Sequence, residues 1–128
     1  MPDTNSSGSG GTVTLALPWP SRNLSPNARC HWAVKAKSVK EARNVARILT
    51  LQAFKLRKPH WSAAELHWEF HPKTANKPDG DNAESSVKAY RDGIADALGL
   101  NDANFTTTKS MGQPVKNGTV FMTIQGTA

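Results

Sequence analysis

The chain is poor in several features from which a fold or a function is often recognised. It has one cysteine, Cys30, in 128 residues, which excludes an internal disulfide and a thiolate zinc site of the CxxC type. It has no apolar run approaching the ~18 residues of a transmembrane helix, and no secretory leader is recognisable at its start. We therefore expect a cytoplasmic protein with no membrane partner.

Common catalytic motifs are also missing. The chain contains no GxSxG, Walker A or GxGxxG sequence, so we expect no nucleotide cofactor. His67 and His71 are four residues apart, but on a strand this spacing is too long for a shared zinc, and both are expected to be ordinary strand and loop residues. The remaining candidates for chemistry are carboxylates and basic side chains.

Acidic residues are outnumbered by basic ones, 10 against 16, which gives a net charge of +6. The excess is concentrated in residues 21–58, where ten basic residues and a single acid give a net charge of +9, whereas residues 59–128 have a net charge of −2. A basic block of this kind indicates a polyanionic partner, and a solvated helix face is the alternative interpretation. The acidic remainder suggests a role beyond phosphate binding.

A single domain is predicted over residues 12–128, after a disordered tail at residues 1–11 that is rich in Gly and Ser. Polar and apolar residues alternate at 12–17 and 65–70, and the segments 105–110 and 119–125 are Thr-rich and strand-like, so four strands are predicted at these positions. Apolar residues recur at intervals of three and four at 38–56 and 82–98, which predicts two amphipathic helices. The order β-α-β-α-β-β favours an α+β fold with a small mixed sheet and both helices packed on one face.

Local signals mark the ends and inner faces of these helices. Ser38 with Glu41 forms a candidate capping box at the start of the first helix, and Gly99 fits a C-cap after the second. Asn117-Gly118 predicts a turn between the last two strands. The first helix is expected to face the core with Val39, Ala42, Val45, Ala46, Leu49, Ala53 and Leu56. The second is expected to do so with Ala83, Val87, Tyr90, Ile94 and Ala97 or Leu98.

The densest group of carboxylates is the segment Asp79-Gly80-Asp81-Asn82. In an extended loop Asp79 and Asp81 would point the same way, and hard oxygen ligands of this kind suit Mg²⁺ or Mn²⁺. The alternative is structural, because Asp-Gly often forms a turn and Asp81 with Glu84 can cap a helix. The two roles can coexist.

Other charged residues follow this segment. Lys88 lies two helical turns after the second aspartate, so it either reaches toward the aspartates or pairs with Glu84 at i,i+4. Asp102 follows the second predicted helix and, taken alone, is expected to be a turn residue. Asp92 and Asp96 lie four apart on that helix and are expected to be solvated charges.

Basic side chains are concentrated on the first predicted helix and in the loop before it. The helix carries a basic stripe formed by Lys37, Lys40, Arg43 and Arg47. A long loop is predicted at residues 21–32, and it contains Arg22, Arg29 and Trp32. Cations beside an aromatic ring are what phosphate contacts and base stacking require, so these residues are candidates for nucleic-acid binding.

Three segments occur in an order and spacing that match a known family. The first is Leu17-Pro18-Trp19-Pro20-Ser21, followed by Asn27 and His31-Trp32. The second is Lys77-Pro78-Asp79-Gly80-Asp81-Asn82, followed by the helix Val87-Lys88-Ala89-Tyr90-Arg91-Asp92-Gly93-Ile94. The third is Leu100-Asn101-Asp102-Ala103-Asn104-Phe105. Together they resemble the RusA family of Holliday junction resolvases, small endodeoxyribonucleases of bacteria and their prophages, over about residues 12–125.

The resemblance implies roles for individual residues. Asp79, Asp81 and Asp102 match the family's three metal-binding acids, and Lys88 matches its essential lysine. Asn101 stands where the family has the first aspartate of a pair, and several extra residues separate the aspartate segment from Lys88. The resemblance also implies a homodimer, which suits a four-way junction whose two opposed strands are cut by related sites.

We therefore expect a Mg²⁺-dependent endodeoxyribonuclease, active also with Mn²⁺, that resolves Holliday junctions by paired cuts during DNA recombination and repair. Its expected location is the cytoplasm of a bacterial or phage-infected bacterial cell. Two other functions are compatible with the same residues. One is a nuclease that acts on flaps or forks, and the other is a non-catalytic DNA-binding protein in which Asp79 and Asp81 form a turn and a cap.

Overall fold

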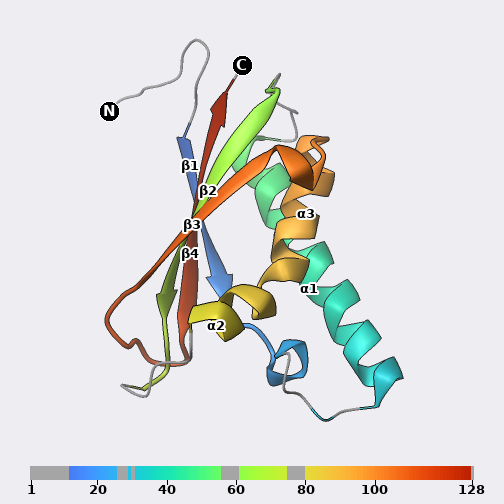
Figure 1. The fold of residues 1–128 in the computed structure, drawn as a ribbon, viewed down its shortest axis with the longest axis vertical. Helices are drawn as coiled ribbons and strands as arrows, with labels where there is room; N and C mark the ends of the chain where they lie inside the picture. Colours follow the sequence, from blue (N-terminus) through green and yellow to red (C-terminus); the bar gives the residue numbers. More distant parts are fainter. Residues whose placement is uncertain (1–11, 26–28, 30, 56–60, 75–79, 128) are drawn as a thin grey trace.

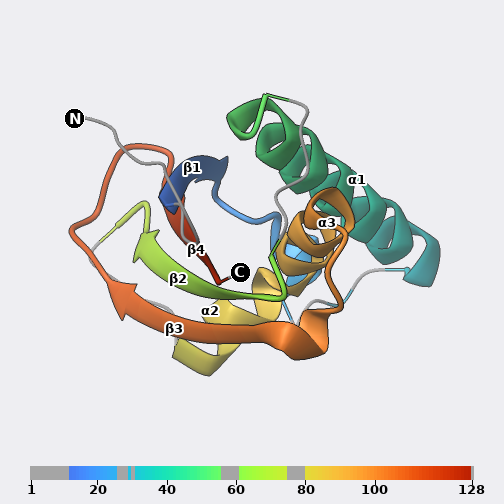
Figure 2. The same cartoon turned by 90° about the horizontal axis from the view of Figure 1, so that it is seen from above.

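A four-stranded mixed sheet carries the helices on one of its faces (Figure 1, Figure 2). The computed structural model describes residues 12–25, 29, 31–55, 61–74 and 80–127, without the side chains of residues 80–82. The predicted α+β class with a small mixed sheet is confirmed, while the predicted tail at residues 1–11 lies outside the described residues. Within the described part of the chain, no helix has the length and apolar character needed to cross a membrane.

The strands are ordered β1-β4-β2-β3 across the sheet. β1 (Thr12–Pro18) and β2 (Ala63–His71) both pair antiparallel with β4 (Thr119–Thr127), so the last strand in sequence lies inside the sheet. β3 (Phe105–Met111) forms an edge and pairs parallel with β2. All four predicted strands are therefore present, each within a few residues of its predicted bounds.

The predicted turn between the last two strands is present but does not join neighbours. Asn117 and Gly118 have φ angles of 67° and 72°, a conformation that Asn and Gly adopt at low cost. β4 then enters the sheet beside β2 and β1 rather than beside β3. The connection between β3 and β4 thus passes the end of β2, which lies between the two strands, instead of forming a hairpin.

The helices form the second layer. α1 (Trp32–Ala53) packs along α3 (Lys88–Leu98), and α2 (Gly80–Ser86) precedes α3 with Val87 between them. Two short 3-10 helices, η1 (Arg22–Leu24) and η2 (Asp102–Asn104), precede α1 and β3. Because α2 and α3 lie between β2 and β3 in sequence, they form the crossover that a parallel strand pair requires.

α1 begins six residues before the predicted start at residue 38, which corrects the predicted capping box. His31 is the N-cap, and its Nδ1 accepts a hydrogen bond from the backbone N–H of Ala33 at 3.1 Å. Ser38 lies inside the helix, where its hydroxyl accepts a hydrogen bond from Asn23 Nδ2 at 3.2 Å. Trp32, predicted to lie in a loop, is consequently the first residue of α1.

The inner face predicted for the first helix is only partly correct. Ala42 and Ala46 are buried, but Val39 and Val45 are 37% and 38% exposed. The reason is that α1 contacts α3 far more than it contacts the sheet, so only a narrow strip of small residues is covered. Leu56 lies outside the described residues.

The second predicted helix is broken at Val87, which has φ −102° and ψ 8°. Its predicted inner face is nevertheless confirmed, because all of its members are buried: Ala83, Val87, Tyr90, Ile94, Ala97 and Leu98. Gly99 is the C-cap, as predicted, with a left-handed φ of 69°. These residues pack on the apolar face of the sheet, where Trp68 of β2 and Met122 of β4 are buried.

Candidate functional site

A cavity of about 250 Å³ opens where the α2–α3 break faces β3. Its lining combines apolar, acidic and basic side chains from both layers: Trp68, Glu84, Ser85, Val87, Lys88, Arg91 and Thr107. We call it the α2–β3 cavity. It contains Lys88, the basic residue that the sequence linked to the aspartates.

Glu84 of α2 points to β3 rather than to Lys88. Its carboxylate accepts hydrogen bonds from Lys109 Nζ at 3.1 Å and from Thr107 Oγ1 at 3.4 Å. The helix break at Val87 places Glu84 and Lys88 in different helices, so the i,i+4 alignment needed for their pairing is lost. The i,i+4 pair that we considered for Lys88 is therefore not formed, and among the described residues no acid is bonded to this lysine.

Arg91 shares a cavity with Lys88 and contacts Asp102. It lies one turn after Lys88 on α3, lines the same cavity, and its Nη2 is 3.5 Å from Asp102 Oδ2. Its Nε is buried and has no hydrogen-bond partner within the described part of the chain. Arg91 is not among the site residues predicted from the sequence, although its i,i+3 spacing from Lys88 indicates that the two share a helix face.

Asp102 lies at the start of η2 with 45% of its side chain exposed. The turn is capped by its neighbour, because Asn101 Oδ1 accepts a hydrogen bond from the Ala103 N–H at 2.9 Å. Asp102 is therefore a turn residue, as expected, but the capping hydrogen bond of the turn comes from Asn101. The Asp102 carboxylate is left to face Arg91 and solvent.

The aspartate pair is described only in part. Asp79 lies outside the described residues, and Asp81 belongs to α2 without a described side chain. Because α2 already includes Gly80, Asp81 lies inside the first turn rather than at the N-cap that we had considered for it. Among the described side chains, no three of His, Cys, Asp and Glu are grouped as metal ligands would be.

The position of Asp102 along the sheet follows from the parallel register. Phe105 pairs with Ala64 near the start of β2, so Asp102 lies at that end, whereas the chain leading to Asp79 leaves β2 at His71. α2 returns along β3, where Glu84 contacts Thr107 and Lys109. Among the described residues, Asp102 therefore has Arg91 as its charged neighbour, and Arg91 shares a cavity lining with Lys88.

The basic stripe of α1 faces one surface, as predicted. Its residues line a shallow groove together with an acid of α3, the full set being Lys37, Lys40, Glu41, Arg43, Asn44, Arg47 and Asp96. Arg43 donates two hydrogen bonds to Asp96, from Nε at 2.6 Å and from Nη2 at 2.8 Å. This guanidinium lowers the pKa of the Asp96 carboxyl below its usual value. Asp96 is exposed, as predicted, but the prediction did not include its pairing with Arg43, which forms because α3 crosses α1 at this point.

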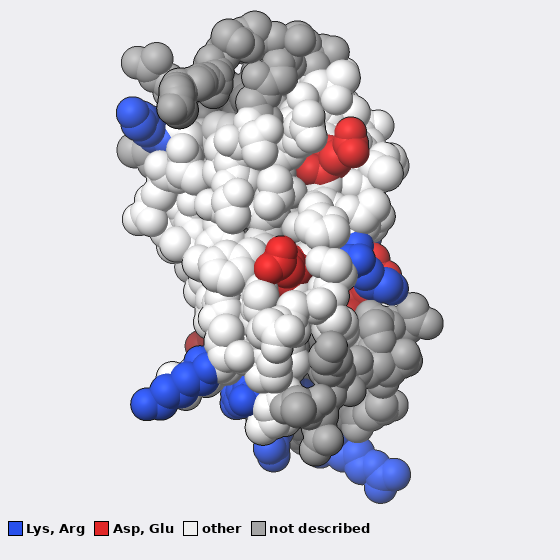
Figure 3. Space-filling model, turned by 90° about the vertical axis from the view of Figure 1, so that its left-hand side faces the viewer, with Lys and Arg blue, Asp and Glu red and all other residues white. Residues whose placement is uncertain are grey.

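Trp32 and the arginines of the preceding segment lie on the surface. The Trp32 side chain is 77% exposed, and its ring lies 5.5 Å from the His31 ring, centroid to centroid. Arg22 and Arg29 are both exposed. The sheet face turned away from the helices carries few Lys or Arg side chains near its centre, and those visible lie toward its margins (Figure 3).

The two histidines of β2 make separate hydrogen bonds, as expected for structural residues. The His67 ring contacts Thr108 Oγ1 at 2.6 Å and Ser110 Oγ at 3.1 Å, both on β3. His71 Nδ1 donates to the Gln113 carbonyl at 2.8 Å, while its Nε2 pairs with Glu69 at 2.5 Å. The Gln113 carbonyl, followed by Glu69, raises the pKa of His71 above its ordinary value.

These features define the class of protein as a small α+β protein with a basic helical surface beside a cavity that holds Lys88 and Arg91. No protein-family model matches the chain. It is 43% identical over 122 residues to an uncharacterized protein of Xylella fastidiosa (strain Temecula1 / ATCC 700964), with 88% of this chain and 76% of that protein covered. The chain belongs to the same family as this Xylella protein.

A solved structure of the bifunctional IspDF from Campylobacter jejuni has a TM-score of 0.43 and 13% identity to the chain. The alignment covers 94% of this chain, which spans 42% of the IspDF chain. A likeness this distant says nothing about activity.

Proposed function

We propose that the chain is a Mg²⁺-dependent endodeoxyribonuclease, similar to the RusA family, that resolves four-way DNA junctions by paired cuts. Mn²⁺ would substitute for Mg²⁺, the working form would be a homodimer, and the location would be the cytoplasm of a bacterial cell. The observation that carries the proposal is the position of Arg91. It lines the α2–β3 cavity together with Lys88, and its Nη2 lies 3.5 Å from Asp102 Oδ2, so it is a neighbour of two residues that the resemblance implicates and that lie 14 positions apart in sequence.

The donor set suits the proposed ion. Asp79, Asp81 and Asp102 offer hard carboxylate oxygens, which Mg²⁺ and Mn²⁺ prefer. The Asp102 carboxylate has capacity for a cation, because it is half exposed and its contact with Arg91 is long, at 3.5 Å. When bound, the ion would supply an activated water and neutralise charge on the leaving oxygen.

The chain's own cations would act on the phosphodiester. Lys88 and Arg91, on one face of α3, would orient the scissile phosphate and stabilise the negative charge that develops on it. Binding strength would come from phosphate contacts of the α1 basic stripe and of Arg22 and Arg29. Trp32, exposed at the start of α1, would stack on a base at the branch point.

The first experiment is cleavage of a synthetic four-way junction with Mg²⁺ or Mn²⁺. Wild type should cut, whereas Asp81→Asn and Asp102→Asn should lose at least tenfold in rate and still bind the junction. Glu65→Gln, which removes an exposed acid of β2, is the matched control and should cut normally. Equal cutting by wild type and Asp81→Asn, or no cutting by any protein with either metal, would contradict the proposal.

A panel of branched substrates separates the remaining functions. Preferred cutting of flaps or forks over four-way junctions would identify a different substrate for the same residues. Junction binding that is indifferent to metal and to Asp102→Asn, without cutting, would identify a non-catalytic DNA-binding protein.

A further inference from the structure

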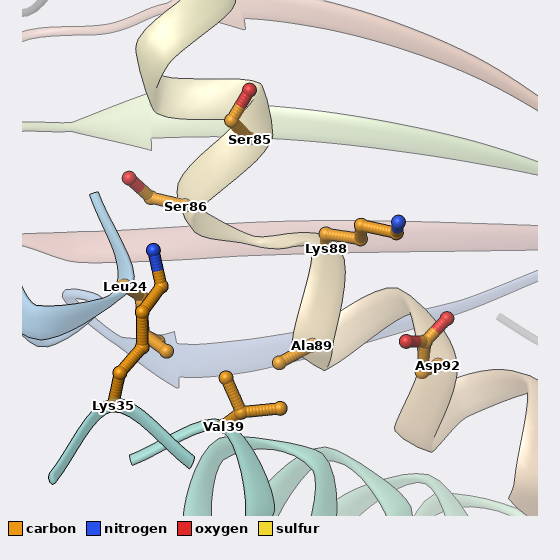
Figure 4. Close-up of a pocket in the computed structure, with 8 residues that line it drawn as sticks. All are labelled: Leu24, Lys35, Val39, Ser85, Ser86, Lys88, Ala89 and Asp92. Atoms are coloured by element: carbon orange, nitrogen blue, oxygen red, sulfur yellow. The ribbon is translucent and has the colours of Figure 1, made fainter. Parts of the chain in front are cut away.

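A second cavity, of about 370 Å³, lies where the first half of α1 faces the α2–α3 break (Figure 4). It is lined by Leu24, Lys35, Val39, Ser85, Ser86, Lys88, Ala89 and Asp92. We call it the α1–α3 cavity. It shares Ser85 and Lys88 with the α2–β3 cavity, so the two cavities adjoin at this lysine.

The lining is divided between apolar and charged groups. Leu24, Val39 and Ala89 lie together, between α1 and the start of α3 (Figure 4). Lys35 extends from α1 toward Ser86 on one side, and Asp92 lies at the opposite end (Figure 4). An elongated ligand with an apolar body and one anionic end would complement this arrangement, because the carboxylate repels an anion at its own end.

Lys35 does not belong to the basic stripe of α1. A position two residues before Lys37 points about 200° away around a helix, so Lys35 faces the α1–α3 cavity while Lys37 faces the groove of the stripe. Lys35 is also only partly exposed. Because Lys35 is separated from the other cations of α1, we expect it to contact a ligand in the α1–α3 cavity rather than one bound along the basic stripe.

We propose that the α1–α3 cavity binds one nucleotide of a DNA strand whose next phosphate lies at Lys88. Lys35 contacts the phosphate of the bound nucleotide, the sugar and base lie on Leu24, Val39 and Ala89, and Asp92 accepts a hydrogen bond from the base edge. The inference deepens the proposed function and rests on it, because the bound nucleotide is the neighbour of the one whose phosphate lies at Lys88. The cavity volume falls in the lower part of the range of small-ligand sites, roughly 300–1,000 Å³.

Titration of the protein with thymidine 5′-monophosphate, followed by NMR, tests the cavity without any cutting. Backbone signals of Leu24, Val39 and Ala89 should shift, and thymidine or inorganic phosphate alone should shift them less at the same concentration. Lys35→Ala should weaken binding of the mononucleotide at least fivefold. Lys116→Ala is the control, because it removes the same charge from an exposed residue that does not line the cavity.

Binding of an oligothymidylate at several salt concentrations provides a second measurement. Loss of one phosphate contact should reduce the slope of log K against log salt concentration by about 0.7 for Lys35→Ala and leave it unchanged for Lys116→Ala. Equal slopes for the two variants, or the same signal shifts with inorganic phosphate as with the mononucleotide, would overturn the inference. Thermal unfolding of both variants checks that they remain folded.

The outcomes distinguish this inference from the proposed function. Junction cleavage that needs Asp81, combined with no effect of the mononucleotide on the cavity signals, would remove the nucleotide site and keep the nuclease. Mononucleotide binding that depends on Lys35, combined with no cleavage in any metal, would keep the nucleotide site and remove the nuclease.

Discussion

Gly93 marks the closest approach of α3 to α1, and its replacement by alanine should destabilise the fold. A β-carbon at this position would overlap the carbonyl oxygen of Arg43 and lie 3.0 Å from both the Arg43 carbonyl carbon and the Ala46 β-carbon. Carbon atoms pack favourably at about 3.5–4.0 Å, so each of these contacts is short by roughly 0.5–1 Å. Because the overlapping atoms of Arg43 belong to the main chain, no side-chain rotation can relieve them.

Two opposing effects set the magnitude. Alanine is favoured over glycine inside a helix by about 1 kcal/mol, whereas overpacking of a close helix contact costs about 1–3 kcal/mol or more. Because the main-chain carbonyl of Arg43 cannot move aside easily, we expect the overpacking cost at this site to be near the upper end of that range. We expect a net loss of about 2 kcal/mol for Gly93→Ala, which corresponds to a decrease in Tm of roughly 8 °C for a domain of this size.

Thermal and urea unfolding, followed by circular dichroism, measure this effect. Gln52→Ala, at an exposed position of α1, is the control and should change stability by no more than about 0.5 kcal/mol. A Gly93→Ala protein as stable as the wild type, or more stable, would refute the reasoning. Helix propensity would then outweigh the contact, and α1 and α3 would be farther apart than described.

Three further predictions concern two ion pairs, Arg43–Asp96 and His71–Glu69. Asp96→Asn should free Arg43 to contact a phosphate, which should steepen the slope of log K against log salt concentration for duplex binding by about 0.9. Fluorescence anisotropy measures this slope. An unchanged slope would show that Arg43 does not face DNA. The same substitution should lower stability by less than about 1 kcal/mol, because both partners are substantially exposed. For His71, the folded-state pKa lies above the ordinary value of 6.5, so its stabilising contribution is complete below that value and is lost as pH rises through the raised pKa. Urea unfolding across this range should show a fall in wild-type stability that His71→Gln lacks, and identical pH profiles for the two proteins would contradict the assignment.

The elements of the fold were largely predictable because their signals are local. Alternation along β2 and β4 and the inner face of residues 82–98 each follow from spacing within one segment. The strand order was not predictable in this way, because β4 pairs with β1 across more than 100 residues of sequence. The start of α1 was missed because a histidine, which is not a common N-cap, caps it.

The candidate site divides in the same way. The shared face of Lys37, Lys40, Arg43 and Arg47 follows from helix periodicity, and the structure agrees. The engagement of Arg43 by Asp96 depends on how two helices cross, which the pattern of either helix alone does not reveal. Arg91 was overlooked for a similar reason, since its contact with Asp102 forms only when the end of α3 turns back through η2.

The helix break at Val87 decides the environment of Lys88. In an unbroken helix over residues 82–98, Lys88 would lie one turn from Glu84, and the favourable Glu-before-Lys order would hold it there. Because the helix is interrupted, Glu84 bonds to Lys109 on β3, and Lys88 lies between two cavities that share it. From the sequence, Lys88 could be placed only by counting helical turns. Its surroundings depend on a tertiary contact between α2 and β3, the hydrogen bond of Glu84 with Lys109. In the proposed nuclease, this contact keeps a carboxylate away from the cation that must meet the phosphate.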